Sequence, residues 1–170
     1  MTEFEKLADS AKRGDAHSFS LLYESVYKEM YKVAFYSLGN RDDAADCVMD
    51  VVTDAFAGIK RLKDPGAFKG WIFKILATKI AGQKKEYVNK SVDISEIPEP
   101  EDEKSSLLQE DASIRSLFFS LPKEDRIILS LNIFMGYGSE EISEILSVPA
   151  GTVRSRKKRA LDKLRSELSR

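Results

Sequence analysis

Apolar residues recur at steps of three and four along most of the chain, which is the spacing that gathers side chains on one face of an α-helix. This pattern predicts three helices in the first half, over residues 16–38, 40–62 and 67–87. Gly39 and the run Asp64-Pro65-Gly66 separate them, because glycine and proline end helices, and Asp42 is the expected N-cap of the second. The stripe on the first of these helices comprises Phe19, Leu22, Tyr23, Val26, Tyr27, Met30, Val33 and Ala34. Three helices with such stripes can enclose one small core.

The second half has shorter helical segments. A helix is expected over about 123–134, and Ser139 is placed to cap a short helix that carries Ile142, Ile145 and Leu146. A brief turn then leads into a long final helix, with Pro149 near its first position, where proline is tolerated. A short helix, a tight turn and a longer basic helix together are typical of a helix-turn-helix.

An acidic stretch lies between the two halves. From residue 93 to 111 the chain has eight acidic residues and one lysine, a net charge of −7, and Pro98 and Pro100 exclude a helix across its middle. Charge repulsion extends such a segment. We therefore predict an all-α fold with two small helical domains, 1–88 and 112–170, joined by an acidic linker over 89–111.

Composition narrows the possible functions. The chain has 170 residues, 42% of them apolar, one histidine and one cysteine, so it can form neither an internal disulfide nor a zinc site of the usual nitrogen and sulfur ligands. No glycine-rich phosphate loop and no hydrolase or zinc-protease motif occurs. We expect a binding protein without catalytic activity, cofactor or metal, located in a reducing cytoplasm.

Positive charge is concentrated at the carboxyl end of a chain whose net charge is −1. Residues 149–170 carry eight bases and two acids, a net of +6. On a helical wheel Val153, Ala160 and Leu164 face inward, and Lys157 lies close to that apolar stripe. A solvated basic surface would also show this charge. Its coincidence with the second helix of a helix-turn-helix favours binding in the major groove of DNA.

Each of two further surfaces allows two interpretations from the sequence alone. The acids of the 40–62 helix fall in a narrow arc opposite its apolar face, which suits either solubility or a basic partner. The 67–87 helix mixes bases with Phe68 and Trp71, aromatic residues that are usually core but can also stack unpaired bases.

Three stretches together resemble bacterial RNA polymerase sigma factors of the extracytoplasmic-function type, a branch of the sigma-70 family. They are DDAADCVMDVVTDAF (42–56), FKGWIFKILATKIAGQKKE (68–86) and LPKEDRIILSLNIFMGYGSEEISEILSVPAGTVRSRKKRALDKL (121–164). The last is shared with other helix-turn-helix regulators, whereas all three in this order are more specific. The resemblance covers about 15–87 and 112–168.

The resemblance implies a promoter-specificity subunit that recognises the -35 and -10 promoter elements and helps to melt DNA. Residues expected to bind the clamp of the largest polymerase subunit are Asp43, Asp46, Met49, Asp50 and Asp54. Residues expected to bind the melted -10 strand are Lys60, Arg61, Lys63, Phe68, Trp71, Lys74, Thr78, Lys79 and Lys85. Residues expected to bind the duplex -35 element are Thr152, Arg154, Ser155, Arg156, Lys158 and Arg159.

The resemblance also implies that the second domain rests on the polymerase flap, and that an anti-sigma factor is a further partner. Some positions differ from the common pattern of the family: Thr78 stands where Asn is usual, Ala77 and Lys85 replace arginines, Gly82 replaces an aspartate, and Ser147 replaces a turn glycine. The alternative hypothesis is a stand-alone helix-turn-helix regulator that binds duplex operator DNA without polymerase.

Overall fold

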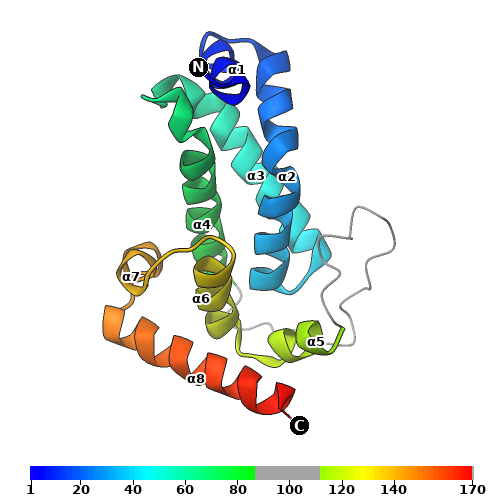
Figure 1. Ribbon diagram of the computed structural model, residues 1–170, viewed down its shortest axis with the longest axis vertical. Helices are drawn as coiled ribbons and strands as arrows, with labels where there is room; N and C mark the ends of the chain where they lie inside the picture. The colour runs from blue at the N-terminus through cyan, green and yellow to red at the C-terminus, as the bar shows by residue number, and fades with distance from the viewer. Residues whose placement is uncertain (87–111, 170) are drawn as a thin grey trace.

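The computed structural model describes residues 1–86 and 112–169, and all the regular structure in these ranges is helical (Figure 1). This confirms the all-α prediction. The helices are α1 (Glu3–Lys12), α2 (Ala16–Leu38), α3 (Arg41–Gly58), α4 (Phe68–Glu86), α5 (Ala112–Ser120), α6 (Lys123–Ile133), α7 (Ser139–Leu146) and α8 (Ala150–Leu168), with short 3-10 turns η1 (Ile59–Arg61) and η2 (Pro65–Ala67). The acidic linker predicted over 89–111 lies outside the described residues.

Local polar contacts set the ends of the first helices. The Asp15 carboxylate accepts a hydrogen bond from the His17 amide at 3.1 Å, and Gly39 ends α2 in the left-handed region at φ 75°. α3 is capped by Asn40, whose side chain accepts from the Asp43 amide at 3.0 Å. The prediction of Asp42 as the cap was therefore wrong, because Asn40 is the residue with extended backbone and Asp42 is already helical.

α1 was not expected from apolar periodicity. It begins with a capping box, in which Thr2 and Glu5 each accept a hydrogen bond from the other's backbone amide. Ala8 and Ala11 are buried, and the Phe4 ring meets the Phe68 ring edge to face at 5.8 Å between centroids. α1 also packs on η1 and η2, so it supports the connection between α3 and α4.

The second group of helices, α5 to α8, contains the helix-turn-helix. α7 begins directly after Gly138, and no side chain caps it, so the expected cap at Ser139 was wrong. Ser147 ends α7 in the left-handed region at φ 56°. Pro149 has extended backbone one residue before α8, where its missing N–H costs no helical hydrogen bond.

The two groups of helices share one continuous hydrophobic core. α6 packs on α2 and α4, and α7 packs on α4, at the lower ends of α2 and α4 (Figure 1). The last turns of α2 are consequently buried all round, from Val33 to Leu38. The sequence predicted a stripe on one face only, and α6 covers the other face.

Candidate nucleic-acid and polymerase interfaces

α8 presents a basic surface to solvent from its amino-terminal half. Val153 and Ala160 are buried and fix the rotation of the helix. Arg154, Ser155, Lys158 and Arg159 are then exposed, and Thr152 is half-buried. The helix lies across the lower end of the molecule, away from α1 (Figure 1). These exposed side chains form what we call the α8 basic face.

Arg156 is placed differently from its neighbours. Its guanidinium lies 3.1 Å from an Asp125 carboxylate oxygen and 3.7 Å from one of Glu124, both on α6. The Arg156 side chain is only 33% exposed. Arg156 therefore joins α8 to α6, a role that the wheel could not show because the α6 acids come from another part of the chain.

α3 divides into a buried face and an acidic outer face. Ala44, Cys47, Val48, Val51 and Ala55 are buried, which turns the acids outward. Asp46, Met49 and Asp50 are exposed and Asp43 is half-buried. Exposed Phe56 extends this surface, although the sequence analysis did not select it. The sequence could have indicated this, because Phe56 comes seven residues after Met49, a spacing that places both side chains on the same face of a helix.

Cys47 belongs to the core and not to this outer surface. The side chain has no exposed area, and burial, followed by the nearby Asp50 charge, raises the pKa of its thiol to about 12. The thiol thus stays protonated at neutral pH and is a small apolar group.

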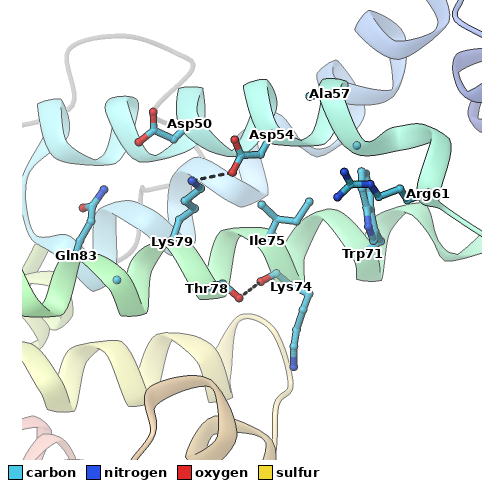
Figure 2. Close-up of a pocket in the computed structure, with 12 residues that line it drawn as sticks. Asp50, Asp54, Ala57, Arg61, Trp71, Lys74, Ile75, Thr78, Lys79 and Gln83 are labelled. Atoms are coloured by element: carbon cyan, nitrogen blue, oxygen red, sulfur yellow. Dashed lines mark hydrogen bonds and ion pairs between the residues drawn. The ribbon is translucent and has the colours of Figure 1, made fainter.

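A groove of about 970 Å³ runs between α3 and α4 (Figure 2). Asp50 and Asp54 lie on the α3 side, Trp71, Ile75, Thr78 and Lys79 on the α4 side, and Arg61 enters from η1. The Lys79 ammonium group lies 2.7 Å from an Asp54 oxygen. Their hydrogen bond raises the pKa of Lys79, so this lysine is charged and paired across the groove.

The predicted -10 residues around the groove differ in how far their side chains are exposed. Lys60, Arg61 and Lys63 are exposed on the loop between α3 and α4, and half-buried Trp71 lines the groove. Phe68 has no exposed area and packs against Phe4, Phe19 and Trp71, so its ring has no free face for a base. The side chain of Lys85 lies outside the described part of the chain. The exposed Thr78 hydroxyl donates to the Lys74 carbonyl oxygen at 2.9 Å.

Lys74 extends away from α3 and toward the second group of helices (Figure 2). Its ammonium group lies 3.9 Å from a Glu141 oxygen on α7 and 5.8 Å from the centre of the Tyr137 ring. Lys74, which is expected to bind DNA and also lines the groove, thus contacts the second group of helices in this structure.

The described residues contain no group of three or more potential metal ligands. Within the same ranges, every helix is too short or too polar to cross a membrane.

Comparison with known proteins gives a consistent result over both groups of helices. Residues 22–82 match the family description "Sigma-70 region 2", and residues 112–164 match "Sigma-70, region 4". The chain is 30% identical to the "ECF RNA polymerase sigma-E factor" of Escherichia coli strain K12, over 88% of this chain and 86% of that protein. It is 27% identical to the "RNA polymerase sigma factor SigV" of Bacillus subtilis, over 84% of this chain and 86% of that protein.

A solved structure of CnrH in complex with the cytosolic domain of CnrY has a similar fold. The TM-score is 0.61 and the sequence identity 23%, over 98% of this chain and 97% of that chain.

Proposed function

Because this chain belongs to the sigma-70 family of RNA polymerase sigma factors, in its extracytoplasmic-function branch, we propose which of its surfaces makes each contact with polymerase and promoter. As a sigma factor it is a non-catalytic subunit that binds RNA polymerase and directs it to promoters. Both groups of helices match the family, which sets aside the stand-alone regulator.

The α8 basic face binds the duplex -35 element. The observation that carries this assignment is the simultaneous exposure of Arg154, Ser155, Lys158 and Arg159 on the second helix of a helix-turn-helix. A helix of this kind fits the major groove, where arginine pairs with guanine and serine contacts phosphates or bases. Arg156 is left out of the base-reading set because Asp125 and Glu124 neutralise it.

Replacing Arg159 tests this assignment. Arg159→Ala should weaken binding to the cognate promoter by about 1–3 kcal/mol and relax the preference at one base pair. Binding is measured as polymerase-holoenzyme affinity over a set of -35 variants. Lys163→Ala is the control, since Lys163 is an exposed base one turn further along α8. Equal losses on every sequence would show that Arg159 contacts only phosphate.

The outer face of α3 binds the clamp of the largest polymerase subunit. Exposed Asp46 and Asp50 supply negative charge, and Met49, 63% exposed, supplies apolar area beside them. An acidic surface with an apolar centre complements a basic helical partner. Asp54 contributes less than the sequence predicts, because Lys79 already pairs with it.

Charge reversal on α3 should separate polymerase binding from DNA binding. Asp46→Lys combined with Asp50→Lys should abolish co-purification with core polymerase and leave the helical content unchanged. The matched control reverses Asp9 and Glu24, which lie on α1 and α2 and give the same change in net charge. If both double variants bind core enzyme like the parent protein, the α3 assignment is wrong.

The groove between α3 and α4 receives the melted -10 strand. Trp71 offers an aromatic surface for stacking, with Arg61 and Lys60 at the loop to neutralise phosphates. A base extruded from the duplex needs such a pocket, and stacking compensates for the lost pairing. Thr78 lies on the same wall, at the position where the family usually has Asn, and offers a hydroxyl there.

Run-off transcription tests the function as a whole. Core polymerase supplied with this chain should initiate at a small set of promoters in a genomic library, and core polymerase alone should not. Initiation at no promoter would overturn the proposal. We also propose that the protein acts in the cytoplasm and has an anti-sigma partner, because CnrH was solved with the cytosolic domain of CnrY. Co-purification from cell extract tests for such a partner.

A further inference from the structure

A second, smaller cavity lies apart from the groove between α3 and α4. Its volume is about 230 Å³, and it is lined by Lys28, Glu29, Lys32 and Val33 of α2, by Phe73 of α4 and by Phe134, which directly follows α6. We call it the α2–α4–α6 cavity. The surfaces proposed above for promoter and polymerase contain none of these residues. The cavity therefore needs an explanation of its own.

Two phenyl rings form fixed walls of this cavity. Phe73 is 8% exposed, and the Phe134 ring lies 5.2 Å from the Tyr36 ring between centroids. Tyr36 is itself 1% exposed, stacks on Phe119 at 5.4 Å and meets Phe118 edge to face at 5.1 Å. Because packing holds both walls in place, a ligand orders little when it binds. Such walls favour an aromatic ligand, which contacts phenyl rings in offset or edge-to-face geometry.

Positive charge surrounds the opening of the cavity. Lys28 and Lys32 are four residues apart on α2, so they lie on the same face of the helix, where like charges repel each other. An anion between the two ammonium groups offsets that repulsion. Glu29 does not cancel this charge, because its carboxylate lies 3.0 Å from the Lys69 ammonium group and is already paired. The opening thus attracts a negatively charged ligand.

Lys32 brings positive charge and aromatic surface close together. Its side chain is half-buried, and its ammonium group lies 4.9 Å from the centre of the Phe134 ring. A ligand that meets both must have its negative charge next to its apolar part. A carboxylate bonded directly to an aromatic ring has this geometry, whereas a long acyl chain does not. The volume admits one ring, since sites for drug-sized ligands measure about 300–1,000 Å³.

From these observations we propose that the α2–α4–α6 cavity binds a small aromatic carboxylate, with its ring between Phe73 and Phe134 and its carboxylate at Lys28 and Lys32. The site goes beyond the proposed function and does not depend on it. A ligand there contacts α2, α4 and the end of α6 at once, and it stabilises the folded chain as its concentration rises.

Titration of the full-length chain with benzoate tests the proposal. Amide NMR signals of Val33, Phe73 and Phe134 should shift and saturate, with a dissociation constant on the order of 1 mM. Benzamide has the same ring without the charge and should bind about fivefold more weakly. Acetate has the charge without the ring and should give no saturable shift. Equal binding of the three compounds, or benzoate shifts confined to other parts of the chain, would overturn the proposal.

A charge variant tests the carboxylate contact. Lys32→Met keeps the apolar stem of the side chain and removes its charge, so benzoate should bind about five- to tenfold more weakly. Lys163→Met is the matched control, because Lys163 is an exposed lysine of α8 outside the cavity. It should bind benzoate like the parent protein. Equal affinity in both variants would overturn the proposal.

Phe134→Leu tests the aromatic wall separately from the charge. Leucine keeps the wall apolar but has no ring, so the dissociation constant for benzoate should rise about two- to fivefold. Circular dichroism checks that each variant keeps its helices, and Lys32→Met decides alone if Phe134→Leu loses them. Parent-like affinity in a folded Phe134→Leu chain would mean that the ring of benzoate binds elsewhere, which also overturns the proposal.

Discussion

At the scale of single residues, Ser147 carries unusual backbone geometry. Its φ of 56° is the only positive φ of a non-glycine residue in the described part of the chain. Without a glycine, the left-handed turn between α7 and α8 brings the serine Cβ close to the following carbonyl oxygen. The sequence already indicated that Ser147 is unusual, since the family commonly has glycine at this position.

Ser147→Gly should stabilise the protein. The left-handed conformation costs a residue with a Cβ about 1–2 kcal/mol, and the greater chain entropy of glycine takes back roughly 0.5–1 kcal/mol. The free energy of unfolding should therefore rise by about 0.5–1 kcal/mol, measured by urea denaturation. Ser147→Ala retains the Cβ and should give no gain; a gain of the same size would show that the backbone is unstrained.

At the scale of helices, the periodicity of three and four predicted where α2, α6 and α8 lie, because each has an apolar stripe of several turns. It missed α1, which is short and owes its start to Thr2 and Glu5. That capping box is readable in the sequence at the spacing S/T-x-x-E, so a search for caps would have found the helix. Helix-cap positions were less predictable, since Asn40 and Asp42 are both good caps and only the backbone decides between them.

A buried arginine joins α5 to α6. Arg126 is 2% exposed, and one of its terminal nitrogens donates to the carbonyl oxygens of Leu121 at 3.0 Å and Phe119 at 3.4 Å. The Phe119 carbonyl lies in the last turn of α5 and the Leu121 carbonyl follows it, where the carbonyls of a helix end lack helical partners. Burial lowers the pKa of the guanidinium to about 10, which still leaves it charged at neutral pH.

Arg126→Ala should lower the free energy of unfolding by about 1–3 kcal/mol, because it leaves buried carbonyl oxygens without a donor. Thermal and urea denaturation measure the loss. Arg165→Ala removes an arginine whose side chain is 76% exposed and should change stability by less than about 0.5 kcal/mol. Similar losses in both variants would mean that the Arg126 hydrogen bonds contribute nothing specific.

At the scale of the whole molecule, sequence patterns predict each helix but not which other helix packs against it. Tyr36 lies outside the stripe recognised on α2, and Phe118 and Phe119 lie some eighty positions further along the chain. Nothing in their local spacing shows that they meet. The exposed charged faces that we propose for polymerase and DNA were easier to locate, because charge patterns on single helices mark them, as in Asp46 and Asp50 or Arg154 and Arg159.

The shared core predicts that the two groups of helices unfold together. Trp71, the only tryptophan, reports on the first group by fluorescence, while circular dichroism reports on all helices. The two urea transitions should coincide in the parent protein. Tyr36→Ala should lower the free energy of unfolding by about 3–5 kcal/mol. It should also make the fluorescence and circular dichroism transitions occur at different urea concentrations.

Tyr27→Ala is the matched control for this experiment. Tyr27 is an aromatic residue of the same helix, but it is 37% exposed and lies outside the contact between the groups. Its removal should cost less and leave the two curves superimposed. Separate curves in the parent protein would show that the groups fold independently.

If the loop between α3 and α4 binds the promoter strand as we propose, the packing of α1 on η1 and η2 has a consequence for that binding. The loop with Lys60, Arg61 and Lys63 is braced from behind by α1 and by the Phe4–Phe68 contact. The backbone of this loop is therefore already ordered in the folded chain, so it loses little conformational freedom when DNA binds. A chain that began after residue 15 would keep every residue assigned to the -10 strand. It would nevertheless bind that strand more slowly, because the loop would have to become ordered each time it met DNA.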